Sequence, residues 1–390
     1  MQTSSPTAYI TGCLDSTAVQ GHFHDFRKAD FNSMNDFLQN LNWTEILHGT
    51  DANQAASSLS YVLVYAIDQF VSKIIRRKPM KPVWSNSHLK SLKRLKRAAL
   101  KKHSKYRIDE TRVAYLEAKQ NYSWLNDRLY AAHQINIQDC LKSELKSFWN
   151  YVNDQRKQTD LPSTMTNGIS EASTIMAIAD LFRSQFSSVF SDEATPVHAI
   201  NAAKINVPQL TNLGHSFTVT LDTVSGALER LKSSTGHGPD CIPSLLLKIC
   251  STALVLPLAT VFNKSLTTGV FPNSWKQSYV FPMHKKGCKQ SVAKYRGIAA
   301  LNAVSKQFEL IVLDELVHIY AHYVSPNQHG FVPKRSTTNL SSYTSFIIRE
   351  MEKGQQVDAI YTDLSAAFDK MNHEITIAKF DKLGLNDRFK

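Results

Sequence analysis

The sequence predicts an α+β protein, with helices in the first half and a mixture of helices and short strands in the second. Two observations carry this prediction. Apolar residues recur at helical spacing in several segments between residues 30 and 190. In contrast, Tyr279–Met283 is an apolar run of strand length, and Val357–Asp363 places alternate apolar residues on one face as a strand does. A hydrophobic content of 43% in 390 residues is enough to build ordinary cores and argues against a disordered chain.

Caps and apolar stripes predict the helices of the first half. Asp30 is placed to cap a helix whose apolar side carries Phe31, Met34, Leu38 and Leu41. A second stripe comprises Leu59, Val62, Leu63, Ala66, Phe70 and Ile74. Pro79 and Pro82 break it, and a basic helix is predicted to begin near Ser85 or Ser87. Two further patterns are Leu141/Leu145/Phe148/Val152 and Ile175/Ala179/Phe182/Phe186.

Two polar segments, Lys157–Gly168 and Ser191–Ser216, are typical of linkers. In the second half, the strand predicted at Val357–Asp363 places alternate apolar side chains on one face and ends in a carboxylate. Helical spacing returns from Ser365 onward. Both predicted strands therefore lie in the second half of the chain, separated by helical segments.

The formal net charge of +12 comes from one segment. Between Val71 and Arg107 lie fourteen Lys and Arg residues and no Asp or Glu. Leu89, Leu92, Leu95 and Ala99 recur there at helical spacing, which leaves the cations on the other face. Such a face binds a phosphate backbone through counterion release, and the predicted nucleic-acid-binding residues are Lys90, Lys93, Arg94, Lys96, Arg97, Lys101 and Lys102. A solvated helix face is the alternative, and an anionic membrane is a weaker rival.

Cysteine usage and the N-terminus exclude two classes of protein. The five cysteines are widely scattered without a Cys-x-x-Cys pair, which argues against a disulfide framework and a zinc knuckle. The first residues lack the charged start and apolar stretch of a secretory signal. The longest apolar run, Ile249–Phe262, is too short to span a bilayer. We expect a protein of the nucleus or cytoplasm without a membrane partner.

Asp363 is the acidic residue at which the last predicted strand turns into a helix. Mg²⁺ prefers oxygen ligands, usually one or two carboxylates together with substrate phosphates, and a rigid strand end suits that role. Taken alone, an Asp ahead of a helix is more often an N-cap. The motifs upstream of Asp363 favour the metal role.

Five motifs in one order resemble the reverse transcriptase domain of LINE-like (non-LTR) retrotransposons. They are Gly236-His-Gly-Pro-Asp-Cys-Ile-Pro243, Pro282-Met-His-Lys-Lys-Gly287, Tyr295-Arg-Gly-Ile-Ala-Ala-Leu-Asn302, Gln328-His-Gly-Phe331 with Arg335-Ser-Thr337, and Asp363-Leu-Ser-Ala-Ala-Phe-Asp369. The resemblance is strong from about Val224 onward and weaker before it. It implies a helical, basic linker region over 1–190, a linker over 191–221, and the fingers and first part of the palm of a right-hand polymerase fold over 222–390.

The resemblance also implies roles for individual residues. Asp363 matches the first metal-binding aspartate, which holds Mg²⁺ between the primer 3′-hydroxyl and the phosphates of the incoming dNTP. Phe368 matches the aromatic gate that clashes with a 2′-hydroxyl. Lys285, for which Lys286 can substitute, and Arg296 match the fingers cations that bind the triphosphate. A family element that lies near the template or substrate is represented here by Gln328, Gly330, Phe331 and Arg335. Within it, Gly330 allows close backbone approach, and Phe331 is as readily assigned to the core.

Departures from the family pattern accompany these matches. Gly297 stands where Pro is usual and Ala299 where Ser is usual. Cys241 stands where Gly is usual, which costs conformational freedom if that turn needs a positive φ. The sequence contains no adjacent Asp-Asp pair, which the family uses for its remaining metal ligands. We therefore expect the two-metal site to be incomplete and the chain to extend no primer.

Three hypotheses follow. The first is a truncated RNA-directed DNA polymerase of a non-LTR retrotransposon, whose partners are an RNA template, a DNA primer and dNTPs. The alternative is a non-catalytic nucleic-acid-binding protein that acts through residues 71–107. The third is an inert genomic remnant, whose exposed sheet edges and apolar surface would favour aggregation.

Overall fold

The computed structural model describes residues 22–75, 82–141, 148–149, 151–152, 161–190, 197–205, 217–332, 335, 338–363 and 367–385. Its strands are β1 (His22–His24), β2 (Lys73–Ile75), β3 (Met165–Thr166), β4 (Glu171–Ala172), β5 (Ser278–His284) and β6 (Tyr295–Leu301). Its α-helices are α1 (Phe31–Gln39), α2 (Trp43–Ile46), α3 (Ala52–Phe70), α4 (Ser87–Tyr106), α5 (Asp109–Asp139), α7 (Ile175–Ser187), α8 (Val197–Ile205), α9 (Leu221–Arg230), α10 (Ser244–Ile249), α11 (Ser251–Thr268), α12 (Ala303–Tyr320), α13 (Thr338–Glu352) and α14 (His373–Lys382). Short 3₁₀ turns are η1 (Phe26–Lys28), η2 (Asn273–Lys276), η3 (Val292–Lys294) and η4 (Ala321–Tyr323).

The strands of the described residues pair as β1–β2, β3–β4 and β5–β6, each pair forming a two-stranded sheet. Helices and small sheets together make the mixed architecture that the sequence predicts. None of the described helices has the length and apolar character needed to cross a membrane.

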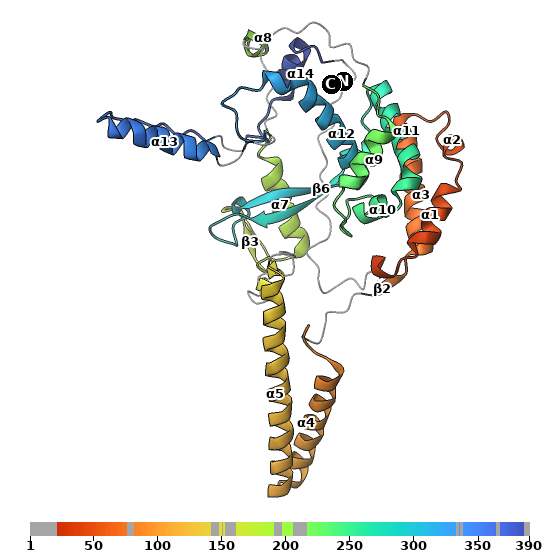
Figure 1. The fold of residues 1–390 in the computed structure, drawn as a ribbon, viewed down its shortest axis with the longest axis vertical. Coiled ribbons are helices and arrows are strands. Elements are labelled where there is room, and N and C mark those ends of the chain that lie inside the picture. Colours follow the sequence, from red (N-terminus) through yellow and green to blue (C-terminus); the bar gives the residue numbers. More distant parts are fainter. Residues whose placement is uncertain are drawn as a thin grey trace. The chain divides into compact units, whose positions relative to one another are not determined.

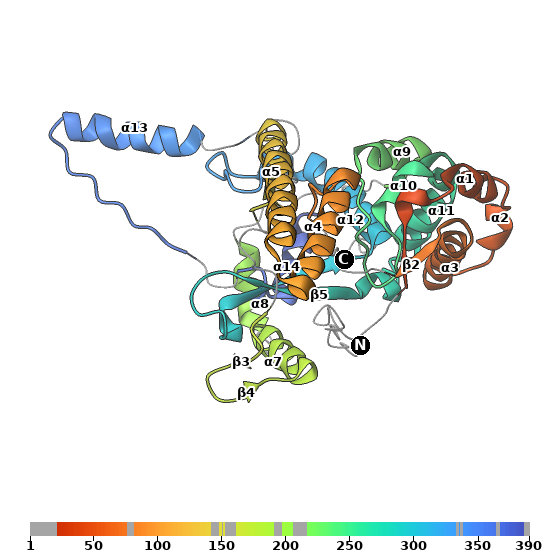
Figure 2. The same ribbon diagram turned by 90° about the horizontal axis from the view of Figure 1, so that it is seen from below.

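Two compact units divide the chain, one formed by residues 1–74 with 162–390 and the other by residues 75–161. The boundaries predicted at residues 190 and 221 do not coincide with these units. The physical reason is that the apolar faces of α1 and α3 pack against α11, so the first helices share a core with the second half of the chain. Figure 2 shows α1 and α3 grouped with α9, α10 and α11. In the other unit, α4 and α5 form an antiparallel helical hairpin (Figure 1).

An aromatic cluster lies in the core of the larger unit, directly ahead of β5. The rings of Phe262, Phe271, Trp275 and Phe308 contact one another with centroid separations between 5.3 and 6.0 Å. Phe262 is fully buried, and Trp275 is 3% exposed. Because β5 begins three residues after Trp275, this cluster anchors the chain where it enters the β5–β6 hairpin.

Local capping explains why several helices begin where the sequence predicts. The Asp30 carboxylate accepts a hydrogen bond from the Ser33 N–H at 3.1 Å and starts α1. Asp51 and Gln54 form a capping box at the start of α3. The prediction that the second stripe continues to Ile74 is wrong, because α3 ends at Phe70 and Ile74 lies in β2.

Both predicted linkers contain secondary structure. The first includes β3, which pairs with β4 through Met165↔Ala172 and Thr166↔Glu171. The second includes α8, while residues 191–196 and 206–216 lie outside the described residues. The predictions that involve Pro79 and Leu145 also fall outside the described residues.

The prediction of a strand at Val357–Asp363 is wrong in this structure. Residues 355–363 belong to no strand, and Ile360 and Tyr361 are 92% and 81% exposed. A β-strand requires a neighbour that accepts and donates its backbone hydrogen bonds, and none of the three sheets includes this segment. The helix expected from Ser365 begins later, at His373 in α14, although residues 364–366 lie outside the described residues.

Candidate functional site

The β5–β6 hairpin carries two of the predicted phosphate-binding cations. Seven residue pairs run from Ser278↔Leu301 to His284↔Tyr295 in antiparallel register. The Tyr295 hydroxyl donates a hydrogen bond to the Lys289 carbonyl at 2.7 Å, which braces the loop that connects the strands. The hairpin is therefore a regular platform whose two faces can be assigned from the register.

One face of the hairpin is covered by α7. A Cβ built at Gly297 would lie 2.9 Å from Val280 Cγ1 and 3.3 Å from Phe186 Cδ2. The ring of Phe182 meets that of Tyr295 edge-on at 5.2 Å. These contacts explain the departure at Gly297, because the Phe186 ring occupies the space that a larger residue would need.

The opposite face presents Lys285 and Arg296. Arg296 is opposite Met283 in the register, and Lys285 follows β5 with its N–H donating to the Lys294 carbonyl at 2.9 Å. Side chains alternate along a strand, so Met283, Lys285 and Arg296 point to the same face. Both cations are exposed, and no ion pair among the described residues involves either of them. A guanidinium and an ammonium on one face, both without ion-pair partners among the described residues, suit phosphate oxygens.

Asn302 ties the far end of the hairpin to the Gly236–Pro243 motif. Asn302 is the residue that follows β6, and it is 2% exposed. The Asn302 Oδ1 accepts from the Asp240 N–H at 3.2 Å, and its Nδ2 donates to the Ser274 carbonyl at 2.8 Å. Gly238 lies against this side chain so closely that its missing Cβ would be 2.5 Å from Asn302 Oδ1. Two of the sequence motifs therefore meet at one buried amide, a contact that the sequence pattern alone does not reveal.

The Gly236–Pro243 turn has the strained residue that the sequence suggests. Cys241 has a φ of 60°, in the left-handed region that favours glycine, and its side chain is exposed. The concern raised by Cys241 in place of Gly is thus confirmed. Beside it, burial raises the pKa of the Asp240 carboxyl to about 6.

The Gln328–Phe331 motif forms a loop that Arg335 holds. The Arg335 guanidinium donates to the carbonyls of Ser325, Pro326 and Gln328, at 3.3, 2.5 and 2.6 Å. The Gln328 amide donates to the Gly330 carbonyl at 2.9 Å. A Cβ at Gly330 would have only Gln328 Nε2 nearby, at 3.9 Å. All three bonds come from Arg335 Nη1, so this one nitrogen of the guanidinium shapes the loop.

Phe331 connects this loop to the Asp363–Asp369 motif. Its φ is 62° and its side chain is 93% exposed, so the assignment of Phe331 to a core is wrong. The Phe331 ring meets the ring of Phe368 edge-on at 5.8 Å. The structure therefore brings Phe331 and Phe368 together.

Asp363 is exposed at the end of the unpaired segment. Among the described residues, no hydrogen bond, ion pair or ring contact joins it to Lys285, Arg296 or Phe368. The same residues include no group of three or more His, Cys, Asp or Glu that could hold a metal ion.

The basic segment forms α4, which begins at Ser87 as predicted, with Asn86 accepting from the Leu89 N–H at 2.8 Å. Five of the seven predicted nucleic-acid-binding residues share its outer face, because they recur at positions i, i+3, i+4, i+7 and i+11. We call them the α4 cationic stripe: Lys90, Lys93, Arg94, Arg97 and Lys101, all exposed.

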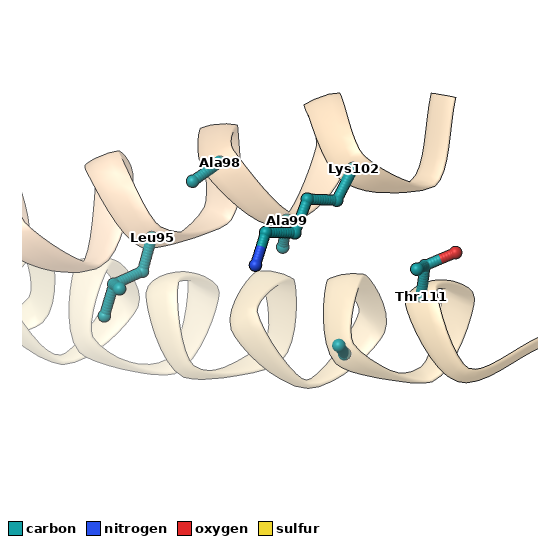
Figure 3. A pocket seen from close by; sticks show the side chains of 6 residues that line it. Leu95, Ala98, Ala99, Lys102 and Thr111 are labelled. Atoms are coloured by element: carbon teal, nitrogen blue, oxygen red, sulfur yellow. The ribbon is translucent and has the colours of Figure 1, made fainter. Parts of the chain in front are cut away.

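The other two predicted residues lie on the side of α4 that meets α5. The Lys96 Nζ is 4.4 Å from the centroid of the Tyr122 ring on α5. Lys102 lines a shallow pocket between the helices with Leu95, Ala98, Ala99, Thr111 and Ala114. Figure 3 shows the Lys102 side chain directed from α4 toward α5. Lys96 thus contacts α5, whereas Lys102 lines the pocket and remains exposed.

Comparison with known proteins complements this geometry. No protein-family model matches the chain. It is 27% identical over 169 residues, 42% of this chain, to the probable RNA-directed DNA polymerase from transposon BS of Drosophila melanogaster. It is 24% identical over 159 residues, 40% of this chain, to the RNA-directed DNA polymerase from mobile element jockey of Drosophila funebris.

This chain is similar to RNA-directed DNA polymerases of retrotransposons. A 115 kDa protein of the type-1 retrotransposable element R1DM of Drosophila melanogaster is also similar, 25% identical over 166 residues, which are 42% of this chain. The resemblance inferred from the five motifs is thereby confirmed. The matched segments span 19%, 17% and 16% of the three relatives, so the chain corresponds to a small part of their length.

Proposed function

We propose that this relative of the retrotransposon polymerases forms the part of an RNA-directed DNA polymerase that grips the incoming dNTP opposite an RNA template. The observation that carries the proposal is the shared, uncovered face of β5–β6, on which Lys285 and Arg296 are exposed without an ion pair. In this interpretation β5–β6 is the fingers hairpin of a right-hand polymerase.

The chemistry of this face follows from its two cations. The Arg296 guanidinium offers a planar fork that binds two phosphate oxygens at once, while the Lys285 ammonium adds a point charge. The packing of α7 on the other face and the Asn302 hydrogen bonds keep the hairpin in place before the nucleotide arrives. Preorganisation of this kind reduces the ordering cost of binding.

The described residues do not complete a metal site. Asp363 stands alone, and the sequence contains no adjacent Asp-Asp pair. What these residues do is bind and orient the triphosphate. The match of Phe368 to the aromatic gate supports a role in favouring deoxynucleotides. Its ring contacts the ring of Phe331 in the Gln328–Phe331 loop.

The proposal is tested by the affinity of the purified chain for a fluorescent dNTP. Arg296→Gln is expected to weaken binding by about 10- to 100-fold, because hydrogen bonds to a charged group contribute about 1.5–3 kcal/mol. Lys289→Gln, which removes an exposed cation from the loop of the same hairpin, is the matched control and is expected to change affinity less than about twofold. Absence of saturable binding, or equal losses in the two variants, contradicts the proposal.

A further inference from the structure

The α4 cationic stripe is a separate charged surface that the nucleotide-binding proposal does not use. Its members extend over eleven residue steps, about 16 Å at 1.5 Å per residue. No ion pair of the described residues involves a residue of α4, and no hydrogen bond between side chains engages the stripe. Five neighbouring cations without acidic partners repel one another, and a polyanion relieves that repulsion.

The two faces of α4 differ in what they contact. On the inner side, Leu89 is buried and Lys96 lies over the Tyr122 ring, so this side is occupied by α5. On the outer side, the stripe has only long cationic side chains. The pairing with α5 therefore selects which lysines and arginines remain available to a ligand.

The composition of the stripe distinguishes between kinds of nucleic acid. Proteins that bind single strands place aromatic side chains among their cations, because unpaired bases stack on them. Apart from Tyr106, its last residue, α4 contains no Phe, Tyr or Trp, and it contains no Asn or Gln of the type that reads adenine in a groove. A line of cations about 16 Å long on one face of a helix suits instead the phosphates of a double helix, of which 16 Å covers about five base pairs at 3.4 Å each.

We propose that the α4 cationic stripe binds the phosphate backbone of a nucleic-acid duplex without sequence preference. Lys90, Lys93, Arg94, Arg97 and Lys101 contact phosphates, and α5 supports α4 from behind. Lys96 and Lys102 take no part in this contact. The site is independent of β5–β6 and adds a second place at which the chain holds nucleic acid.

Two variants with the same change in charge test the proposal. Arg94→Gln/Lys101→Gln removes two cations from the stripe, whereas Lys96→Gln/Lys102→Gln removes two from the inner side of the same helix. Affinity is measured over a range of salt concentrations for DNA and RNA duplexes of about 20 base pairs, two helical turns. Circular dichroism checks that both variants keep their helices.

The stripe variant is expected to bind duplex more weakly than wild type by at least about tenfold. The slope of log K against log salt should fall by about 2, because each lost phosphate contact removes about 0.9. The inner variant should keep the wild-type slope. Equal effects of the two variants would overturn the assignment to the stripe, and tighter binding of the single strand than of the duplex would overturn the choice of ligand. Neither outcome bears on dNTP binding, which Arg296→Gln tests separately.

Discussion

Replacing Gly238 by alanine is expected to lower the free energy of unfolding by about 3 kcal/mol, at the upper end of the usual cost of overpacking. The added Cβ would lie 2.5 Å from Asn302 Oδ1, 2.8 Å from Asn302 N and 2.8 Å from the Leu301 carbonyl carbon. Two of these three atoms belong to the backbone at the end of β6, so no side-chain rotation relieves the clash. Relief requires moving the loop, which breaks the hydrogen bond from the Asp240 N–H to Asn302.

Gly236 is the matched control, two residues earlier in the same turn. A Cβ at Gly236 would have Ser234 Oγ as its nearest neighbour, at 3.4 Å, an ordinary contact. Gly236→Ala is therefore expected to change stability by less than about 1 kcal/mol. Urea denaturation followed by tryptophan fluorescence compares the two variants. If Gly238→Ala is no less stable than Gly236→Ala, the buried Asn302 contact does not anchor the hairpin.

Asp240→Asn is expected to stabilise the protein by about 3 kcal/mol at pH 7 and to leave it unchanged near pH 3.5. Burial raises the pKa of Asp240 from 3.8 to about 6, and a pKa difference of one between the folded and unfolded chain corresponds to about 1.4 kcal/mol. Below pH 3.8 the carboxyl is neutral in both the folded and the unfolded chain. Between pH 3.8 and 6 the unfolded chain loses this proton first, so the stability of wild type falls as the pH rises.

Asparagine keeps the oxygen that accepts a hydrogen bond from the Ile242 N–H, which makes it a close mimic of the neutral carboxyl. The difference in unfolding free energy between Asp240→Asn and wild type is measured by urea denaturation at several pH values. The expected curve rises between pH 3.8 and 6 and is flat above that range. A pH-independent difference would show that burial does not hold the proton on Asp240.

The sequence anticipates the parts of the fold that depend on neighbouring residues. The start of α1 follows from Asp30, the start of α4 lies where a polar residue precedes the apolar spacing, and β5 coincides with a short apolar run. Caps and periodicity act within a few residues, so a single segment contains the information. The strain at Cys241 is likewise evident from one substitution against the family pattern.

The features that the sequence does not predict depend on contacts with residues far away in the chain. The segment at 357–363 has the apolar spacing of a strand but finds no neighbour in the described sheets. The importance of Asn302 arises from Asp240 and Ser274, which lie 62 and 28 residues away. The division of the seven basic residues between two faces of α4 requires knowing where α5 packs. Spacing alone treats these positions as equivalent.

Chemical labelling of lysines tests most directly whether the β5–β6 face binds the phosphates of a dNTP. Pyridoxal 5′-phosphate followed by borohydride modifies lysines at phosphate sites, and mass spectrometry identifies them. We predict that Lys285 is labelled, that a dNTP suppresses this labelling while the deoxynucleoside does not, and that Lys289 is unaffected by either. Labelling of Lys285 that persists in the presence of saturating dNTP, or protection of Lys286 in its place, would contradict this assignment.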